Sequence, residues 1–116
     1  MERFTFEAAS AFTPKSELLQ GVTIAPLTPS ISRGATVQAA VFRLAPGGRI
    51  VRHPATFPQI LAVIEGSGRV SGADGVFAPI AAGEVVFWPE GEEHETESAD
   101  GMTAVIIEAE GLQPEV

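Results

Sequence analysis

Turn-forming residues divide this chain into short segments, and their spacing limits the folds that are open to it. Glycine and proline supply 12 and 9 of the 116 residues, and clusters that contain them recur about every 8–12 residues, as in β-sandwiches and barrels. The segments between these clusters are short and apolar-rich: residues 37–45, 59–64, 85–88 and 102–108. No segment combines a sustained helical period with capping residues. The sequence therefore predicts an all-β chain.

Particular turns bound the expected strands. The Pro-Gly-Gly sequence at residues 46–48 predicts the end of strand 37–45, and Gly-Ser-Gly at residues 66–68 predicts a hairpin turn after strand 59–64. The Asp-Gly step at residues 74–75 suits a further hairpin. Pro89 is expected to stop strand 85–88, since proline lacks the amide hydrogen that a ladder needs.

Length and composition favour one domain. A chain of 116 residues that is 45% hydrophobic is long and apolar enough to fill one core. We expect a single domain over residues 1–116, with N-terminal strands and loops in 1–35, the barrel core in 36–110 and a tail in 111–116. The chain has no cysteine, which excludes disulfides, thiolate catalysis and cysteine metal clusters.

Charge and hydropathy exclude two classes of partner. The net charge is −8 with a single lysine, whereas binding of nucleic-acid phosphates needs clustered Lys and Arg. No apolar run approaches the roughly 20 residues that a membrane helix needs, and the N-terminus has no signal-peptide core. We therefore expect a cytoplasmic protein without nucleic-acid or membrane partners.

Only two histidines occur in the chain, and each lies at fixed distances from glycines and prolines. The first block reads Gly47, five residues, His53, five residues, Gln59, six residues, Gly66. The second block reads Gly83, five residues, Pro89, one residue, Gly91, two residues, His94. Matched places in two strand-and-turn blocks predict that His53 and His94 share one pocket.

Strand alternation predicts which side chains face that pocket. Successive side chains point to opposite faces of a strand, so His94, Thr96 and Ser98 should point inward and the glutamates between them outward, as a solvated strand face. The same rule sends three further side chains inward: Gln59, Leu61 and Val63. Three aromatic residues are candidates for the pocket wall, although aromatics beside strand ends more often belong to the core: Phe57, Phe87 and Trp88.

The two blocks resemble the paired signature of the cupin superfamily, G-x5-H-x-H-x3-4-E-x6-G and G-x5-P-x-G-x2-H-x3-N. Seven of the ten positions are kept, and the chain departs at Ala55, Gln59 and Ser98, where the signature has histidine, glutamate and asparagine. The resemblance implies a cupin-type antiparallel jelly-roll barrel. It also implies a metal site, for which His53, Gln59 and His94 occupy the matching positions.

Imidazole nitrogen is a good ligand for Zn, Ni, Fe and Mn, whereas the Gln59 amide oxygen is a weaker, uncharged donor. The site would therefore hold a divalent ion with at most three protein ligands and none that is anionic. Ala55 would leave a position open for water or substrate, as catalytic metal sites require. In the alternative interpretation, the two histidines only form hydrogen bonds in a polar cavity.

Three functions remain open, since fold alone does not choose among them. The first is a metal-dependent enzyme that acts on a small organic molecule, of the dioxygenase, isomerase or cyclase type. The second is a metal-free binding or sensor module for a small ligand, and the third is a structural cupin with a vestigial site.

We also expect a homodimer. Exposed strand edges are prone to pair with another chain, and the apolar N-terminal strands expected around Phe4, Phe6, Val22 and Ile24 would offer such an edge. The family resemblance likewise implies dimers.

Overall fold

The computed structural model of the chain describes residues 1–7 and 11–115. Its elements follow in the order β1 (Leu19–Pro26), η2 (Ile31–Arg33, a 3-10 helix), β2 (Gln38–Pro54), β3 (Gln59–Ser71), β4 (Ala78–Ala81), β5 (Val85–Trp88), β6 (Glu93–Ser98) and β7 (Met102–Glu108). All the strand pairings are antiparallel. The prediction of an all-β chain is confirmed.

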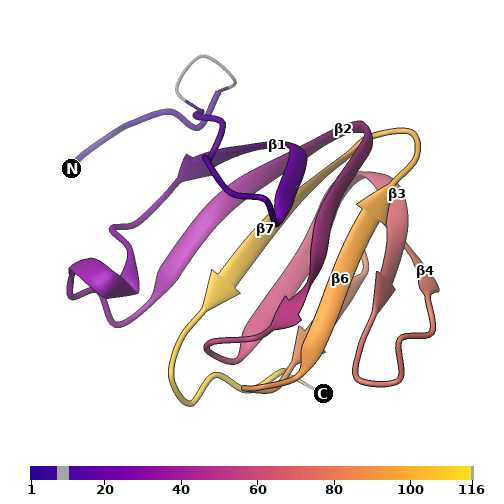
Figure 1. The fold of residues 1–116 in the computed structure, drawn as a ribbon. Coiled ribbons are helices and arrows are strands. Elements are labelled where there is room, and N and C mark those ends of the chain that lie inside the picture. The colour runs from indigo at the N-terminus through magenta and orange to yellow at the C-terminus, as the bar shows by residue number, and fades with distance from the viewer. Residues whose placement is uncertain (8–10, 116) are drawn as a thin grey trace.

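Two long strands close the barrel. The first half of β2 pairs with β7 and its second half with β6. Strand β3 divides in the same way between β7 and β6. Strands β2, β6, β3 and β7 therefore form a closed ring, with β1 added beside β2, and β4 and β5 beside β3 (Figure 1). This is the predicted jelly-roll barrel.

Glycines bend β2 and β3 where the chain was predicted to turn. Gly47 has a φ of 82° and Gly66 a φ of 80°. Residues other than glycine rarely adopt this backbone conformation. A Cβ on Gly68 would lie 2.4 Å from the Glu97 carbonyl oxygen, so the neighbouring backbone also requires glycine here. The predicted strand end at 46–48 and hairpin turn at 66–68 are wrong, because these bends carry each strand from one half of the barrel to the other without ending it.

Other boundaries agree with the sequence. Strand β5 ends at Trp88, directly before Pro89, and β7 covers Met102–Glu108. The expected hairpin forms between β3 and β4, where the Gly75 amide donates to the Gly72 carbonyl at 3.0 Å.

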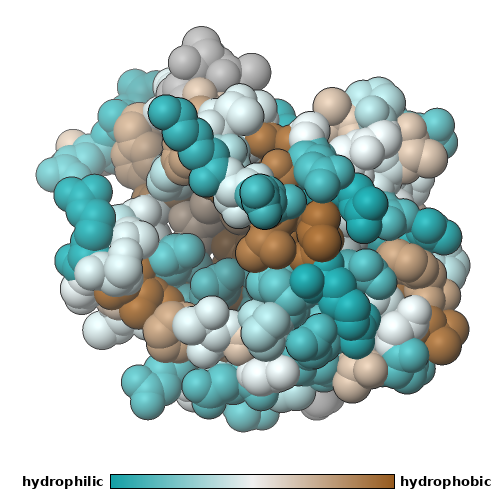
Figure 2. All heavy atoms as spheres, in the orientation of Figure 1, coloured by the Kyte–Doolittle hydropathy of each residue, from teal (hydrophilic) through white to brown (hydrophobic). Residues whose placement is uncertain are grey.

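The core lies between the inward faces of the two halves of the barrel. Its buried apolar members come from every β-strand except β6, and each large aliphatic side chain stabilises the fold by about 1.5–3 kcal/mol when fully buried. They are Val22, Leu44, Ile50, Leu61, Val63, Val70, Ile80, Trp88, Met102, Ala104 and Ile106. Figure 2 shows mainly polar side chains over one face of the molecule, with apolar groups visible in a hollow near its centre.

The N-terminal segment differs from the expectation. Phe4 and Phe6 are 70% and 52% exposed and lie outside any strand, so the prediction that they form an N-terminal strand is wrong. Phe12 instead makes an isolated bridge to Ile24 through two backbone hydrogen bonds of 2.8 and 2.9 Å. No helix among residues 1–7 and 11–115 is long and apolar enough to cross a membrane.

Candidate functional site

Strand β6 presents its alternate side chains to opposite faces. His94, Thr96 and Ser98 are 3%, 1% and 1% exposed, whereas the glutamates between them lie on the outward face and pair with arginines. The predicted alternation along this strand is confirmed. The same holds for β3, whose Gln59, Leu61 and Val63 are buried.

A β-bulge in β2 turns His53 toward His94. Ile50 lies opposite Thr96, and His53 lies opposite His94, so β2 has one more residue than β6 between the two pairs. Without that extra residue, the alternation from the buried Ile50 would point position 53 outward. The bulge restores the inward direction, which is a known use of bulges beside functional sites. As a result, the two imidazole ring centroids lie 4.5 Å apart.

Backbone carbonyls fix the tautomer of both rings. His53 Nδ1 lies 2.7 Å from the Val51 carbonyl oxygen, and His94 Nδ1 lies 3.0 Å from that of Glu92. A carbonyl oxygen only accepts, so each Nδ1 must carry the hydrogen and donate it. In the neutral ring, Nε2 is then a bare lone-pair nitrogen, which is how metal-binding histidines are commonly oriented.

His94 is held neutral by its surroundings. Its ring packs against Trp88 with centroids 4.4 Å apart. Burial lowers the pKa of His94 below 6.5, and the nearby His53 lowers it further, while the bond to the Glu92 carbonyl partly opposes both effects. Trp88 is thus the candidate aromatic that contacts the site, whereas Phe87 points to the opposite face of β5.

Gln59 faces a carboxyl group from the neighbouring strand. It lies directly opposite Glu108 in the β3–β7 ladder, and its Nε2 donates to Glu108 Oε1 at 2.9 Å. This bond directs the amide nitrogen to the carboxyl group and leaves Oε1 as the acceptor of the amide. Glu108 was not among the predicted site residues, although the inward alternation of Ala104 and Ile106 along β7 points to it.

One cavity joins His53, Gln59 and Glu108. Its volume is about 150 Å³. It is lined by Ser16, Leu18, Leu19, Phe42, Ile50, His53, Gln59, Ile106 and Glu108. Of the three predicted ligands, two therefore line the cavity. The third, His94, does not line it and contacts His53 with an angle of 51° between the rings.

Burial raises the pKa of the Glu108 carboxyl group above 4.5. The hydrogen bond from Gln59 and the proximity of His53 oppose this increase only in part. A carboxyl group in such surroundings can hold or release a proton closer to neutral pH than an exposed one.

Among the described residues, no group of three or more His, Cys, Asp or Glu side chains is placed to hold a metal ion. Any ion at this site would need Gln59 as a ligand beside the two imidazoles, or a movement of Glu108.

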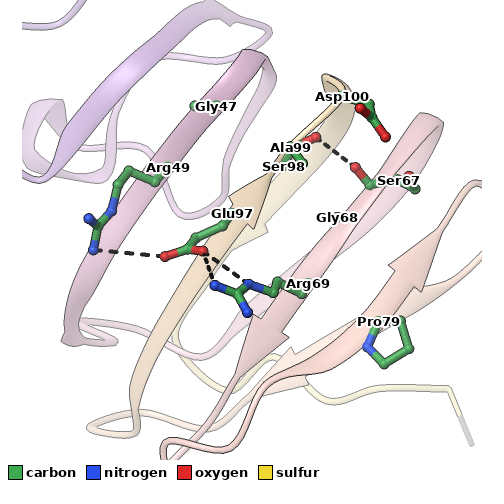
Figure 3. A pocket seen from close by; sticks show the side chains of 11 residues that line it. Gly47, Arg49, Ser67, Gly68, Arg69, Pro79, Glu97, Ser98, Ala99 and Asp100 are labelled. Carbon is green, nitrogen blue, oxygen red and sulfur yellow. Dashed lines mark hydrogen bonds and ion pairs between the residues drawn. The ribbon is translucent and has the colours of Figure 1, made fainter.

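A larger groove lies on the outside of the barrel. It measures about 580 Å³ and runs over β2, β6 and β3. Figure 3 shows three of its charged side chains turned toward one another, with Asp100 apart from them: Arg69 donates to Glu97 Oε2 at 2.6 and 3.0 Å, and Arg49 lies 3.9 Å from the other Glu97 oxygen. Because the groove contains neither histidine, we place the candidate site in the smaller inner cavity.

The fold is a closed antiparallel barrel, and two adjacent strands, β2 and β6, carry histidines on its inner side. Residues 40–109 match the family described as Cupin domain. The chain belongs to this family, as the motif resemblance predicts.

Solved structures share the fold. The polyketide cyclase RemF from Streptomyces resistomycificus aligns with a TM-score of 0.79 and 20% identity over 99% of this chain and 88% of its own. A cupin 2 conserved barrel domain protein from Salinispora arenicola aligns with a TM-score of 0.75 and 20% identity over 96% and 90%. A predicted oxalate decarboxylase from Thermotoga maritima aligns with a TM-score of 0.65 and 25% identity over 76% and 80%. No match is found among the curated proteins.

Proposed function

We propose that this cupin binds a divalent metal ion (Zn, Ni, Fe or Mn) and acts on a small organic molecule. The ligands would be Nε2 of His53, Nε2 of His94 and Oε1 of Gln59. The observation that carries the proposal is the distance from each Nδ1 to a backbone carbonyl oxygen, 2.7 Å for His53 and 3.0 Å for His94, because each Nδ1 must then donate and each Nε2 is left bare on the two adjacent strands.

The two imidazole nitrogens and the amide oxygen are suitable ligands for a divalent ion, but together they form a weak site because none of them is charged. Both imidazoles present lone pairs, and the lowered pKa of His94 keeps its ring unprotonated near neutral pH. The amide of Gln59 contributes oxygen without charge. A bound ion would therefore keep its full positive charge and act as a Lewis acid on a substrate oxygen.

Glu108 supplies proton chemistry beside these ligands. It lines the same cavity as His53 and Gln59, and burial raises the pKa of its carboxyl group toward the range in which general acids and bases work. Among the dioxygenase, isomerase and cyclase types, this carboxyl group favours the two that move protons, isomerase and cyclase.

Elemental analysis tests the proposal. Protein purified without chelator or metal-affinity tag should contain up to one ion per chain, and protein stripped with EDTA should take up one added Zn²⁺. His53→Ala and His94→Ala should each abolish this uptake. Glu93→Ala, which removes the outward neighbour of His94, should leave it unchanged. Equal uptake by all four proteins would contradict the proposal.

A second candidate is a metal-free module that binds a small ligand. It is favoured by the Gln59–Glu108 hydrogen bond, which pairs both side chains without an ion, and by the lack of a third histidine or carboxylate placed for a metal among the described residues. Ligand binding by protein that takes up no metal would establish this function. A protein that binds neither a metal ion nor a small ligand would be a structural cupin with a vestigial site.

We further propose a cytoplasmic homodimer. Ile64 and Val85 are 60% and 59% exposed and lie on the outward face of the adjacent strands β3 and β5, where a second copy would cover them. Light scattering at micromolar concentration should give twice the 12.1 kDa chain mass, and a monomeric mass would contradict the dimer.

A further inference from the structure

Three polar side chains of the inner cavity present acceptors, and the fourth, Ser16, is exposed, accepts from the Leu18 amide and keeps a hydroxyl hydrogen to donate. His53 uses Nδ1 to donate to Val51 and so presents the bare Nε2. Gln59 uses Nε2 to donate to Glu108 and so presents Oε1. Glu108 accepts that bond through Oε1 and keeps a second carboxyl oxygen. A ligand that satisfies these atoms must bring a hydrogen-bond donor, because buried acceptors without a partner are costly.

The remaining walls are largely apolar. Leu19, Phe42, Ile50 and Ile106 line the cavity, and Leu18, which is 40% exposed, lies where it meets the surface. A volume of about 150 Å³ resembles that of an apolar protein cavity known to admit benzene. No lysine or arginine is among the lining residues, so the cavity offers no counter-charge to an anion.

We propose that this cavity binds a small, neutral, mostly apolar molecule whose hydroxyl group donates to Glu108, and that it rejects carboxylates of the same size. The inference deepens the proposed function, since it names the ligand class of the same site. A hydrocarbon would leave the acceptors unsatisfied. A carboxylate would meet the Glu108 carboxyl group with no cation between them.

Four probes built on one benzene ring separate these cases: phenol and toluene, which match each other in size, and benzoate and benzamide, which match each other in size and differ in charge. Binding would be followed by NMR shifts of the His53 and Gln59 side chains, first on the protein as purified, with its metal content measured, and then after EDTA treatment. In the treated protein, phenol should bind at least about tenfold more tightly than toluene, because only phenol brings a hydroxyl hydrogen to the buried acceptors. Benzamide should likewise bind more tightly than benzoate, because it is neutral and has an amide donor.

Two variants provide the internal control. Glu108→Gln should weaken phenol binding about tenfold and strengthen benzoate binding, because it removes the repulsion and adds an amide donor. A merely damaged cavity would weaken both. Glu110→Gln changes an exposed glutamate two residues further on and should alter neither affinity. If circular dichroism shows that Glu108→Gln does not fold, the comparison of the probes on the native protein still tests the inference.

Benzoate binding as tight as phenol binding in the EDTA-treated native protein would overturn the inference, as would unchanged phenol affinity in a folded Glu108→Gln. A Zn²⁺ titration of the same samples keeps the two proposals apart. Selective phenol binding without Zn²⁺ uptake would contradict only the metal proposal. Zn²⁺ uptake without selective phenol binding would contradict only the present inference.

Discussion

The two faces of β6 carry opposite kinds of chemistry on alternate residues. Inward, His94 is buried against Trp88, and this burial lowers its pKa. Outward, Glu93 and Glu97 pair with arginines of the neighbouring strands, Glu93 with Arg52 at 3.3 Å and Glu97 with Arg69 at 2.6 Å. The charges stay where water screens them, while the interior presents lone pairs. The barrel is therefore arranged to take in a cation or a hydrogen-bond donor.

Removing His94 should have the largest effect. His94→Ala deletes a ring packed between His53 and Trp88, and we expect it to lower the free energy of unfolding by about 2–4 kcal/mol, as for other large-to-small changes in a core. Glu93→Ala, on the opposite face, should cost less than about 1 kcal/mol. Urea denaturation of both variants measures the difference. Equal losses would show that the two faces do not differ in this way.

Gln59→Glu should be the next largest change. It places a second carboxylate opposite Glu108, where 2.9 Å now separates an amide donor from its acceptor. In EDTA the variant should lose about 1–3 kcal/mol, since a buried charge is left unpaired. With Zn²⁺ it should regain stability and bind the ion more tightly than the native chain, because a carboxylate offsets the charge of the ion.

Calorimetric melting with and without Zn²⁺ measures both effects. Gln113→Glu, which adds the same charge at an exposed position of the C-terminal tail, should show neither. A lower melting temperature that Zn²⁺ does not restore would exclude an ion from this position and favour the metal-free module.

The pH dependence of stability should be smaller and should have a defined sign. The folded pKa of His94 lies below its unfolded value of 6.5, so the unfolded chain binds more protons in the window between the two. Stability then rises with pH across that window. In EDTA, the stability advantage of the native protein over His94→Ala should therefore shrink as pH falls below 6.5. An advantage that is constant or grows would show that the ring is not held neutral.

The outward arginines should matter least. Arg69→Ala breaks the pair with Glu97 on an exposed surface, where such pairs are worth about 0–1 kcal/mol. The loss should fall further at 1 M salt, at which the Debye length is about 3 Å. If Arg69→Ala lowered the free energy of unfolding by more than about 2 kcal/mol at both low and high salt, the pair would contribute much more to stability than an exposed ion pair does.

Periodicity and motif spacing predicted the barrel, the inward faces of β6 and of the first part of β3, and the pairing of two histidine blocks. They failed where a strand departs from regular geometry. In the sequence, Gly47 and Gly66 resemble residues of tight turns that reverse the chain. The same left-handed glycine conformation also occurs where a continuous strand bends, so the sequence does not distinguish the two. The bulge between Ile50 and His53 has no local signature, since it depends on how β2 meets β6.

Glu108 shows a different limit. Its inward direction follows from the alternation along β7, but its position opposite Gln59 depends on the register of two strands that are far apart in sequence. The site predicted from the sequence therefore lacks a carboxylate, whereas the folded chain places Glu108 beside Gln59, the amide that replaces the signature glutamate.

The most direct test of the account is the protonation of the two rings. Long-range ¹H–¹⁵N NMR of the EDTA-treated protein at neutral pH should show hydrogen on Nδ1 and none on Nε2 for both His53 and His94. One equivalent of Zn²⁺ should then shift both Nε2 resonances together. Hydrogen on Nε2 of either ring, or Nε2 resonances that do not respond to Zn²⁺, would contradict the claim that these nitrogens are presented to an ion.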